Sequence, residues 1–190
     1  MATGTEVVLV RHGETEWSRM GRHTSHTDVA LTDTGRRQAI TIGERLRTQD
    51  FALVLTSPLS RATDTCLLAG YGDAGRATDD LREWDYGEYD GRTTADIRRE
   101  MPGWTVWTHP APGGETVEQV GERVDRVIEL ACAARGSVLL FGHAHALRVL
   151  GARWCGLPPA EGRLLALDPA TVSVLGYERE TAVIVRWNSP

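Results

Sequence analysis

The sequence contains no lysine, since all 21 of its Lys and Arg residues are arginine. The formal net charge is -5, which argues against a protein that binds nucleic acid through a basic face. Arginine stays charged at any working pH, and its planar fork binds two oxygens of a phosphate at once. The positive charge of this chain is therefore suited to local pockets for compact anions.

Cysteine and long apolar runs are scarce as well. The three cysteines, Cys66, Cys132 and Cys155, lie far apart without a CxxC pair, which predicts free thiols in a reducing compartment. The first apolar run, Val7 to Val10, lacks the basic flank of a targeting segment, and no stretch approaches the length of a membrane span. We expect a cytoplasmic protein with no membrane partner.

The composition is that of an ordinary globular protein, with 41% hydrophobic and 25% charged residues. A chain of 190 residues can bury a substantial core, so we expect a single domain over residues 1–190. No internal repeat or long linker interrupts it. Alternating strand and helix patterns predict an α/β fold, a three-layer α/β/α sandwich around a mostly parallel sheet.

Short apolar runs predict the strands of this sheet. EVVLV at residues 6–10 is rich in β-branched residues, as expected for a central strand that is buried on both faces. A second strand is predicted over residues 51–57 and a third in SVLLFG at residues 137–142. The tail, residues 171–187, is predicted to form a terminal hairpin.

Helical patterns separate these strands. The apolar residues that recur at helical spacing in the first helix are Ala39, Ile42 and Leu46. Thr32 is the expected N-cap of that helix. The next helix would have Pro58 as its first residue and end near Ala69. Thr116 and Gln119 form a capping-box pair that predicts the start of a long helix.

The middle of the chain, residues 70–114, has a different character. It is rich in glycine, proline and tryptophan, and only a short helix near Thr94 to Glu100 is predicted in it. We interpret this segment as an inserted cap or lid.

Polar, reactive residues follow the three predicted parallel strands. Arg11 and His12 follow the first strand, Arg61 follows the second, and His143 follows the third. In an open parallel sheet, ligands bind beyond the carboxyl ends of the strands. We therefore expect these residues to converge on one site, which would hold a compact, multiply charged anion such as phosphate.

An alternative explanation of each residue does not involve a ligand. Arg11 and Arg61 could be surface ion-pair partners, and His12 and His143 could be satisfied core residues. For any one of them alone, the two interpretations are about equally common. The occurrence of all four at strand ends favours the anion site.

Four blocks of the sequence resemble the signature motifs of the histidine phosphatase superfamily, the group of the cofactor-dependent phosphoglycerate mutases. They are RHGETEW from Arg11, TSPLSRATDT around Arg61, LREWDYGEYDG around Glu83 and FGHAHALR around His143, with GGET at residues 113–116 as a fifth. RHG alone would recur by chance, but these blocks occur in order between residues 5 and 157. The resemblance implies the phosphoglycerate mutase-like fold.

The resemblance also implies a covalent mechanism that needs no cofactor. His12 would attack phosphorus and form a phosphohistidine, while Arg11, Arg61 and His143 would bind the phosphoryl oxygens. The cationic surroundings would favour the neutral, nucleophilic form of His12. Glu83 would be the general acid for the leaving oxygen and then the base that activates water.

Further residues are assigned to the niche of Glu83 and to substrate contact. Without the resemblance, Glu83 would be taken for a solvated loop carboxylate, but the flanking Trp84 and Tyr86 favour a partly apolar niche. This aromatic pair could also stack on a sugar or a flat leaving group, so both residues are assigned to substrate binding. Ser18 and Thr24 fall where the family places small polar groups near the phosphate.

The loop after the first block contains additional polar residues, Arg22, His23 and His26, which could contact the rest of the substrate. Histidines in polar loops are usually only solvated. His23 with His26, and the HxH at residues 143–145, have the spacing of metal ligands, but no cysteine or carboxylate cluster accompanies them. We expect no metal and no cofactor.

The choice between a phosphatase and a mutase rests on departures from the mutase pattern. The mutases follow the acidic residue with an arginine, whereas this chain has Trp84 there and a short middle segment. A mutase must also shield its phosphoenzyme from water. LREWDYGEYDG and HTSHTDVALT look more like acid phosphatases of the actinobacterial type and phosphatases of sedoheptulose bisphosphate.

We therefore predict a metal-independent phosphomonoester hydrolase that acts on small phosphorylated metabolites, with sugar phosphates as the first candidates. The alternative is a cofactor-dependent phosphoglycerate mutase, an isomerase. A non-catalytic phosphate-binding protein is disfavoured, because none of the five residues implied in catalysis is missing. The expected partner is a small phosphorylated substrate, and a homodimer is compatible with the sequence.

Overall fold

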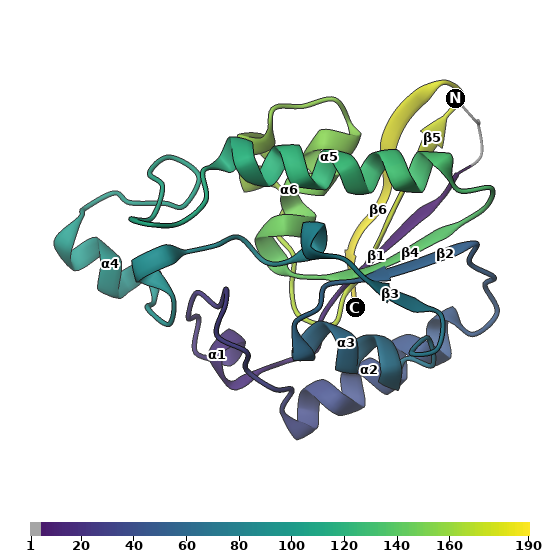
Figure 1. The fold of residues 1–190 in the computed structure, drawn as a ribbon, viewed down its shortest axis with the longest axis horizontal. Coiled ribbons are helices and arrows are strands. Elements are labelled where there is room, and N and C mark those ends of the chain that lie inside the picture. Colours follow the sequence, from purple (N-terminus) through teal and green to yellow (C-terminus); the bar gives the residue numbers. More distant parts are fainter. Residues whose placement is uncertain (1–4) are drawn as a thin grey trace.

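A mixed sheet runs through residues 5–190, the part of the chain that the computed structural model describes (Figure 1). The strands are β1 (Val7–Arg11), β2 (Leu53–Thr56), β3 (Gly75–Ala77), β4 (Val138–Gly142), β5 (Val172–Glu178) and β6 (Thr181–Ser189). They are arranged in the order β3-β2-β4-β1-β5-β6. The first four in this order are parallel, and β5 and β6 form an antiparallel hairpin. The predicted α/β fold, its mostly parallel sheet and its terminal hairpin are confirmed.

Helices cover both faces of the sheet. Figure 1 shows α5 (Val117–Ala133) and α6 (Ala144–Trp154) on one side, and α2 (Asp33–Leu46) and α3 (Ser60–Leu68) on the other. The shorter helices in the connections are α1 (Glu16–Arg19), α4 (Thr94–Glu100), η1 (Asp79–Leu81), η2 (Gly87–Tyr89) and η3 (Pro159–Leu164). Within residues 5–190, no helix has both the length and the apolar character needed to cross a membrane.

The side chains of β1 show how this strand joins the two helical layers. Val7 and Leu9 belong to the core cluster that includes α5 and α6, whereas Val8 and Val10 belong to the cluster that includes α2 and α3. Each of the four is at most 1% exposed. Because successive side chains of a strand point to opposite faces, an uninterrupted apolar run is what a strand between two helical layers requires.

The strand register brings the ends of β1, β2 and β4 to one edge of the sheet. Arg11 of β1 pairs with Gly142 of β4, and β2 ends at Thr56 on the other side of β4. The residues that follow β1 and β4, His12 and His143, therefore leave the sheet at the same level. The N–H of His12 donates to the carbonyl of Gly142 at 3.0 Å.

Several helix boundaries agree with the predicted caps. Thr32 is the N-cap of α2, and Thr116 and Gln119 form the capping box of α5. The short helix α4 spans the predicted residues. Helix α1 was not predicted, although Thr15 and Ser18 form a capping box at its start. It has only four residues, too few for an apolar periodicity to mark it.

The prediction that Pro58 is the first residue of α3 is wrong, because Leu59 is the N-cap and the helix begins at Ser60. The hydroxyl of Ser57 accepts a hydrogen bond from the N–H of Leu59 at 3.3 Å, and this contact favours an extended chain before the helix. Asp28 accepts from the N–H of Ser60 at 2.9 Å. A long-range partner thus satisfies the first turn of α3.

The segment predicted as an inserted lid, residues 70–114, begins within the sheet. β3 pairs in parallel with β2 and is the edge strand. After β3 the chain leaves the sheet, and α4 lies at the end of the molecule away from the strands (Figure 1). The lid stays a prediction for the residues that follow β3.

Two glycines allow α2 to lie directly against the loop that follows β1. A Cβ atom on Gly35 would lie 2.1 Å from the carbonyl oxygen of Glu14. A Cβ atom on Gly13 would lie 2.4 Å from the carbonyl oxygen of Gly35. Since both neighbours are backbone atoms, no side chain can be added at either position without moving the loop or the helix.

We expect Gly35→Ala to lower the free energy of unfolding by about 1–3 kcal/mol, because the added methyl group forces α2 away from the loop. Urea denaturation measures the change, and the exposed Arg36→Ala on the same helix is the control. Equal stability of the two variants would contradict the close contact.

Candidate active site

A cavity of about 210 Å³ lies at the edge of the sheet where β1 and β4 end. It is lined by several of the predicted site residues, namely Arg11, His12, Ser18, Arg22, His23, Thr24, Glu83 and Tyr86. Other lining residues were not predicted to belong to the site, namely Gly21, Ala144, His145, Arg148 and Leu167. His12 and the surrounding arginines make this cavity the candidate site.

A larger cavity, of about 500 Å³, lies between α2 and the end of β6. Its lining includes Arg37, Arg45, Asp168 and Asn188 but none of the predicted site residues. It also contains no histidine, cysteine or serine. It lacks the imidazoles that accompany the arginines of the smaller cavity, and we therefore place the candidate site by its side chains and not by its volume.

His12 directly follows β1 and is 5% exposed. Its Nδ1 lies 2.7 Å from the carbonyl oxygen of Gly13. Because a carbonyl can only accept, Nδ1 carries the proton and Nε2 carries a lone pair. Burial lowers the pKa of His12 well below its ordinary value, and the charges of Arg11 and Arg61 lower it further. His12 is thus a neutral imidazole with one nitrogen available as a nucleophile.

His143 is the N-cap residue of α6 and is fully buried, with its ring centroid 5.1 Å from that of His12. The Nε of Arg61 donates to its Nδ1 at 3.2 Å, so Nε2 carries the proton and donates to the hydroxyl of Ser57 at 2.7 Å. Burial and the charge of Arg61 lower the pKa of His143 well below its ordinary value. His143 is therefore a neutral hydrogen-bond donor.

Arg61 contacts His143 and is held by the loop before α2. Its side chain is fully buried, and its guanidinium donates to backbone carbonyls of residues 24–27 at 3.1 to 3.3 Å. Neither Arg61 nor His143 lines the cavity, although the resemblance implies that both bind the phosphoryl group. His143 lies against the ring of His12 and the charge of Arg61 acts on it, and a phosphoryl group that met Arg61 would replace some of these carbonyl contacts.

Arg11 lines the cavity and is anchored from outside the central strands. It donates through one terminal nitrogen to the carbonyl of Leu167 at 2.5 Å. Its buried Nε has no partner among the described residues. Burial lowers the pKa of Arg11, whereas the nearby Glu83 raises it. A bound anion would offset the cost of this unpaired donor.

Glu83 forms another part of the cavity wall and is 8% exposed. Its Oε1 accepts from the N–H groups of Trp84 at 2.9 Å and Ala146 at 3.0 Å, and its Oε2 accepts from the N–H of His145 at 3.2 Å. His145 and Ala146 lie in the first turn of α6, whose N–H groups have no partner inside the helix. The carboxylate is therefore held at the N-terminus of the helix that follows His143.

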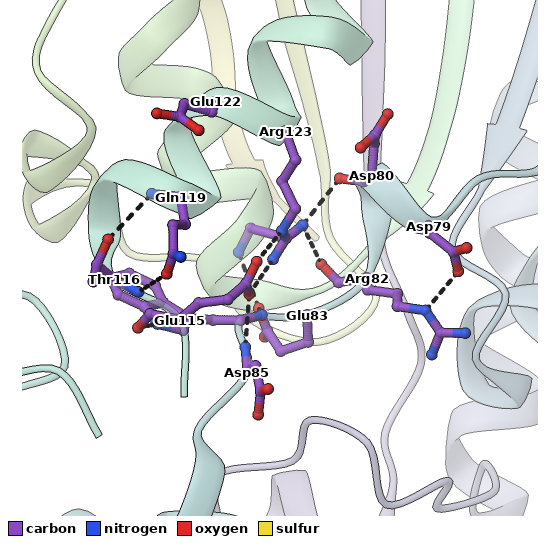
Figure 2. A network of polar contacts seen from close by, with 12 residues as sticks. Asp79, Asp80, Arg82, Glu83, Asp85, Glu115, Thr116, Gln119, Glu122 and Arg123 are labelled. Carbon is purple, nitrogen blue, oxygen red and sulfur yellow. Dashed lines mark hydrogen bonds and ion pairs between the residues drawn. The ribbon is translucent and has the colours of Figure 1, made fainter. Parts of the chain in front are cut away.

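Figure 2 shows how the chain on both sides of Glu83 is held in place. The guanidinium of Arg123, on α5, donates to the carbonyl of Arg82 at 2.7 Å and to both carboxylate oxygens of Glu115 at 2.8 and 3.0 Å. Glu115 accepts in turn from the N–H of Asp85 at 2.9 Å. Neither Arg123 nor Glu115 was singled out in the sequence, apart from the GGET block that contains Glu115.

Tyr86 and His145 meet in the cavity wall, with the tyrosine oxygen 2.6 Å from Nδ1 of the imidazole. Burial raises the pKa of Tyr86 well above its ordinary value and lowers that of His145 well below it. A neutral tyrosine therefore donates to a neutral histidine. His145 was considered only as part of a metal-ligand spacing, whereas its position one turn before Arg148 could have indicated a shared helix face.

The prediction that Trp84 contacts the substrate does not agree with its position. Trp84 is fully buried and does not line the cavity. Its Nε1 donates to the carbonyl of Glu115 at 2.9 Å, and its ring meets that of Trp107 at 5.4 Å and 90°. It belongs to the core cluster that also contains Trp104, because the backbone after Glu83 directs this side chain inward.

The loop before α2 divides its polar residues between the cavity and the surface. Ser18, Arg22, His23 and Thr24 line the cavity, whereas Nε2 of His26 lies 2.9 Å from Asp85 outside it. The two histidine pairs with metal-ligand spacing, His23 with His26 and His143 with His145, do not belong to a larger cluster. In residues 5–190, no group of three or more His, Cys, Asp or Glu side chains is placed to hold a metal ion.

The fold and the cationic cavity are those of an α/β protein that binds compact anions. A profile of the histidine phosphatase superfamily (branch 1) matches residues 7–190. An acid phosphatase of Mycobacterium tuberculosis is 45% identical over 185 residues, which cover 94% of this chain and 91% of the relative. The chain belongs to the histidine phosphatase superfamily, and it is a phosphatase.

Two further relatives indicate the range of substrates in the family. A sedoheptulose 1,7-bisphosphatase of Saccharomyces cerevisiae is 36% identical over 183 residues, which cover 79% of this chain and 67% of the relative. The solved structure of a mycobacterial glucosyl-3-phosphoglycerate phosphatase in complex with VO3 superposes with a TM-score of 0.87. It is 29% identical, and the match covers 97% of this chain and 99% of that chain.

Breaking the contact between Arg123 and Glu115 should test how the position of Glu83 is maintained. We expect Glu115→Gln to lower the free energy of unfolding by about 3 kcal/mol, because the buried guanidinium loses its charged partner. It should also lower kcat more than it raises KM, because Glu83 loses its fixed position. The exposed Glu122→Gln, next to Arg123 on α5, is the control. A Glu115→Gln variant that behaves like this control would contradict the role of Glu115.

Stability should fall as the solution becomes acidic. Burial lowers the pKa of His23 from 6.5 to about 4. Below pH 6.5 the unfolded chain therefore binds a proton at this residue that the folded chain does not bind until the pH approaches 4, so the free energy of unfolding decreases across that range. In urea denaturation, the free energy of unfolding of His23→Gln should decrease less between pH 6.5 and pH 4 than that of the wild type. The exposed His109→Gln is the control and should show the same decrease as the wild type. An equal decrease in the free energy of unfolding for all three proteins would contradict the prediction.

Proposed function

We propose that this phosphatase hydrolyses small phosphomonoesters through a phosphohistidine on His12, without a metal ion. The observation that carries the proposal is the state of His12. Its Nδ1–H is held by the carbonyl of Gly13, burial and two arginines keep the ring neutral, and the residue lines a cationic cavity. A histidine in this tautomer, beside a group that binds anions, can attack phosphorus directly.

The reaction would proceed in two displacements. In the first, Nε2 of His12 forms a bond to phosphorus, the ester P–O bond breaks, and the leaving oxygen takes a proton from Glu83. In the second, water attacks phosphorus as Glu83 accepts its proton, and the P–N bond breaks to release inorganic phosphate. Arg11, Arg61 and His143 would offset the negative charge of the phosphoryl group during both steps.

The dimensions of the cavity and the names of the relatives support a small substrate. A volume of about 210 Å³ is below the range that holds drug-sized ligands, so a small metabolite fits better than a polymer. The related proteins named for sedoheptulose bisphosphate and glucosyl-3-phosphoglycerate act on phosphorylated sugars or sugar derivatives. We therefore propose sugar phosphates as the substrate class, and a small phosphorylated substrate, not a nucleic acid, as the partner.

A cofactor-dependent phosphoglycerate mutase remains the alternative activity. The position after Glu83 favours hydrolysis, because Trp84 is buried in the core where the mutase pattern places an arginine. Interconversion of the two monophosphoglycerates, with bisphosphoglycerate as primer, measures the mutase reaction. A mutase turnover that exceeds phosphate release would reverse our ordering of the two activities.

We expect His12→Ala to abolish phosphate release from an aryl phosphate, with a loss of at least about 10³-fold in kcat, because the variant lacks the nucleophile that would form the phosphohistidine. The phosphoenzyme trapped from the wild type should lose its phosphate in acid, as a phosphohistidine does. An acid-stable phosphoenzyme should not be found. The exposed His109→Ala should keep full activity. Activity of His12→Ala, or loss of wild-type activity with a chelator, would contradict the covalent, metal-independent mechanism.

A further inference from the structure

The cavity contains more arginine than the transfer of one phosphoryl group requires. Arg11 lines the cavity with His12, and the charges of Arg11 and Arg61 both act on His12, which accounts for the phosphoryl site. Arg148, on α6, lines the same cavity and has no role in the proposed displacements. It is the last residue of the block FGHAHALR, but the sequence assigned it no role, so its chemistry has to be explained from its surroundings.

The guanidinium of Arg148 is held in a fixed orientation by neutral groups. Its Nε donates to the carbonyl of Gly162 at 3.1 Å, and one terminal nitrogen donates to the carbonyl of Arg163 at 3.1 Å. Its central carbon lies 4.7 Å from the centroid of the Trp107 ring. These contacts orient the side chain without neutralising it, and the other terminal nitrogen has no hydrogen-bond partner among the side-chain contacts of residues 5–190.

Within residues 5–190, Arg148 has no ion-pair partner, although the charge of Glu83, which lines the same cavity, acts on it. In the described part of the chain, no carboxylate lies within 4.0 Å of its guanidinium, whereas Arg153 on the same helix pairs with Asp125 at 2.8 Å. Burial lowers the pKa of Arg148 and the charge of Glu83 raises it, while the charge of Arg148 lowers the pKa values of Arg11 and His145. Two guanidiniums that repel each other across a small cavity favour a ligand with negative charge near both.

We infer that Arg148 determines specificity: it binds a second anionic group of the substrate, a phosphate or a carboxylate, while the phosphoryl group to be transferred lies at His12. The preferred substrates are thus small phosphomonoesters with a second negative group a few bonds away. This inference rests on the proposed hydrolysis at His12, and it narrows the substrate class. The planar fork of arginine, held over a tryptophan ring, suits the oxygens of either group.

Matched substrates distinguish the two anionic groups. 3-Phosphoglycerate and glycerol 3-phosphate differ mainly by a carboxylate in place of a hydroxymethyl group, and fructose 1,6-bisphosphate and fructose 6-phosphate differ by one phosphate. Phosphate release is measured for all four with the wild type. The wild type should prefer the doubly anionic member of at least one pair by roughly tenfold in kcat/KM, the size expected for a charge-assisted hydrogen bond. No preference in either pair would overturn the inference.

Variants test whether Arg148 is the source of that preference. Arg148→Gln should remove it, with a loss of roughly tenfold or more for the doubly anionic substrate, mostly in KM, and less than about threefold for its partner. Arg148→Lys should restore part of the preference, because it keeps the charge but loses the fork. The control is Arg163→Gln, since Arg163 is exposed, pairs with Glu161 and does not line the cavity.

The failure of this inference and that of the proposed function give different results. If Arg148 only connects α6 to η3, Arg148→Gln lowers kcat/KM equally for both members of each pair, and the inference is wrong while hydrolysis stands. If no substrate is hydrolysed, the proposed function fails. Calorimetric binding of the same four compounds to His12→Ala, with and without Arg148→Gln, then still shows whether Arg148 favours the doubly anionic ligands. An equal affinity for both members of each pair would overturn the inference in that case as well.

Discussion

The parallel pairing of β1 and β2 with β4 is the constraint on which the rest of the site depends. It places the carboxyl ends of these strands at one edge of the sheet, so that His12 and His143 are neighbours although they are 131 positions apart in the sequence. Arg61 reaches the same edge from α3, which follows β2. Side chains on strand ends between two packed layers have little freedom to move, which favours catalytic groups that need a fixed geometry.

The electrostatic environment of the site is dominated by buried cations, of which Arg61 has only a long ion-pair contact, 3.9 Å from Asp28. Burial and the two nearby guanidiniums keep His12 neutral, so the protein maintains the nucleophile by concentrating positive charge around it. This arrangement has a cost, because the buried Nε of Arg11 has no partner within residues 5–190. A negatively charged substrate in the cavity offsets the repulsion between the guanidinium groups. The relief of this repulsion contributes to the free energy of binding.

The sequence predicted those parts of the site that depend on local patterns, and it missed those that depend on long-range packing. An apolar run followed by Arg11 and His12 marks a buried strand with a reactive end, and this pattern is visible in a short window. The inward direction of Trp84 depends on its neighbours in the core, and the contact of Arg148 with η3 joins residues 14 or more positions apart. No motif marks either feature, because a side chain's direction is set by the fold around it.

Helix α6 connects the phosphoryl chemistry to the choice of substrate. His143 caps its start, the N–H groups of its first turn hold Glu83, and Arg148 lies on its second turn in the same cavity. Because α6 carries His143, the N–H groups that hold Glu83 and Arg148, the distances among these groups are fixed by the rise of the helix. A substrate whose two anionic groups match the distance between the phosphoryl site and Arg148 can satisfy both sites, whereas a substrate with a single phosphate leaves the charge of Arg148 uncompensated.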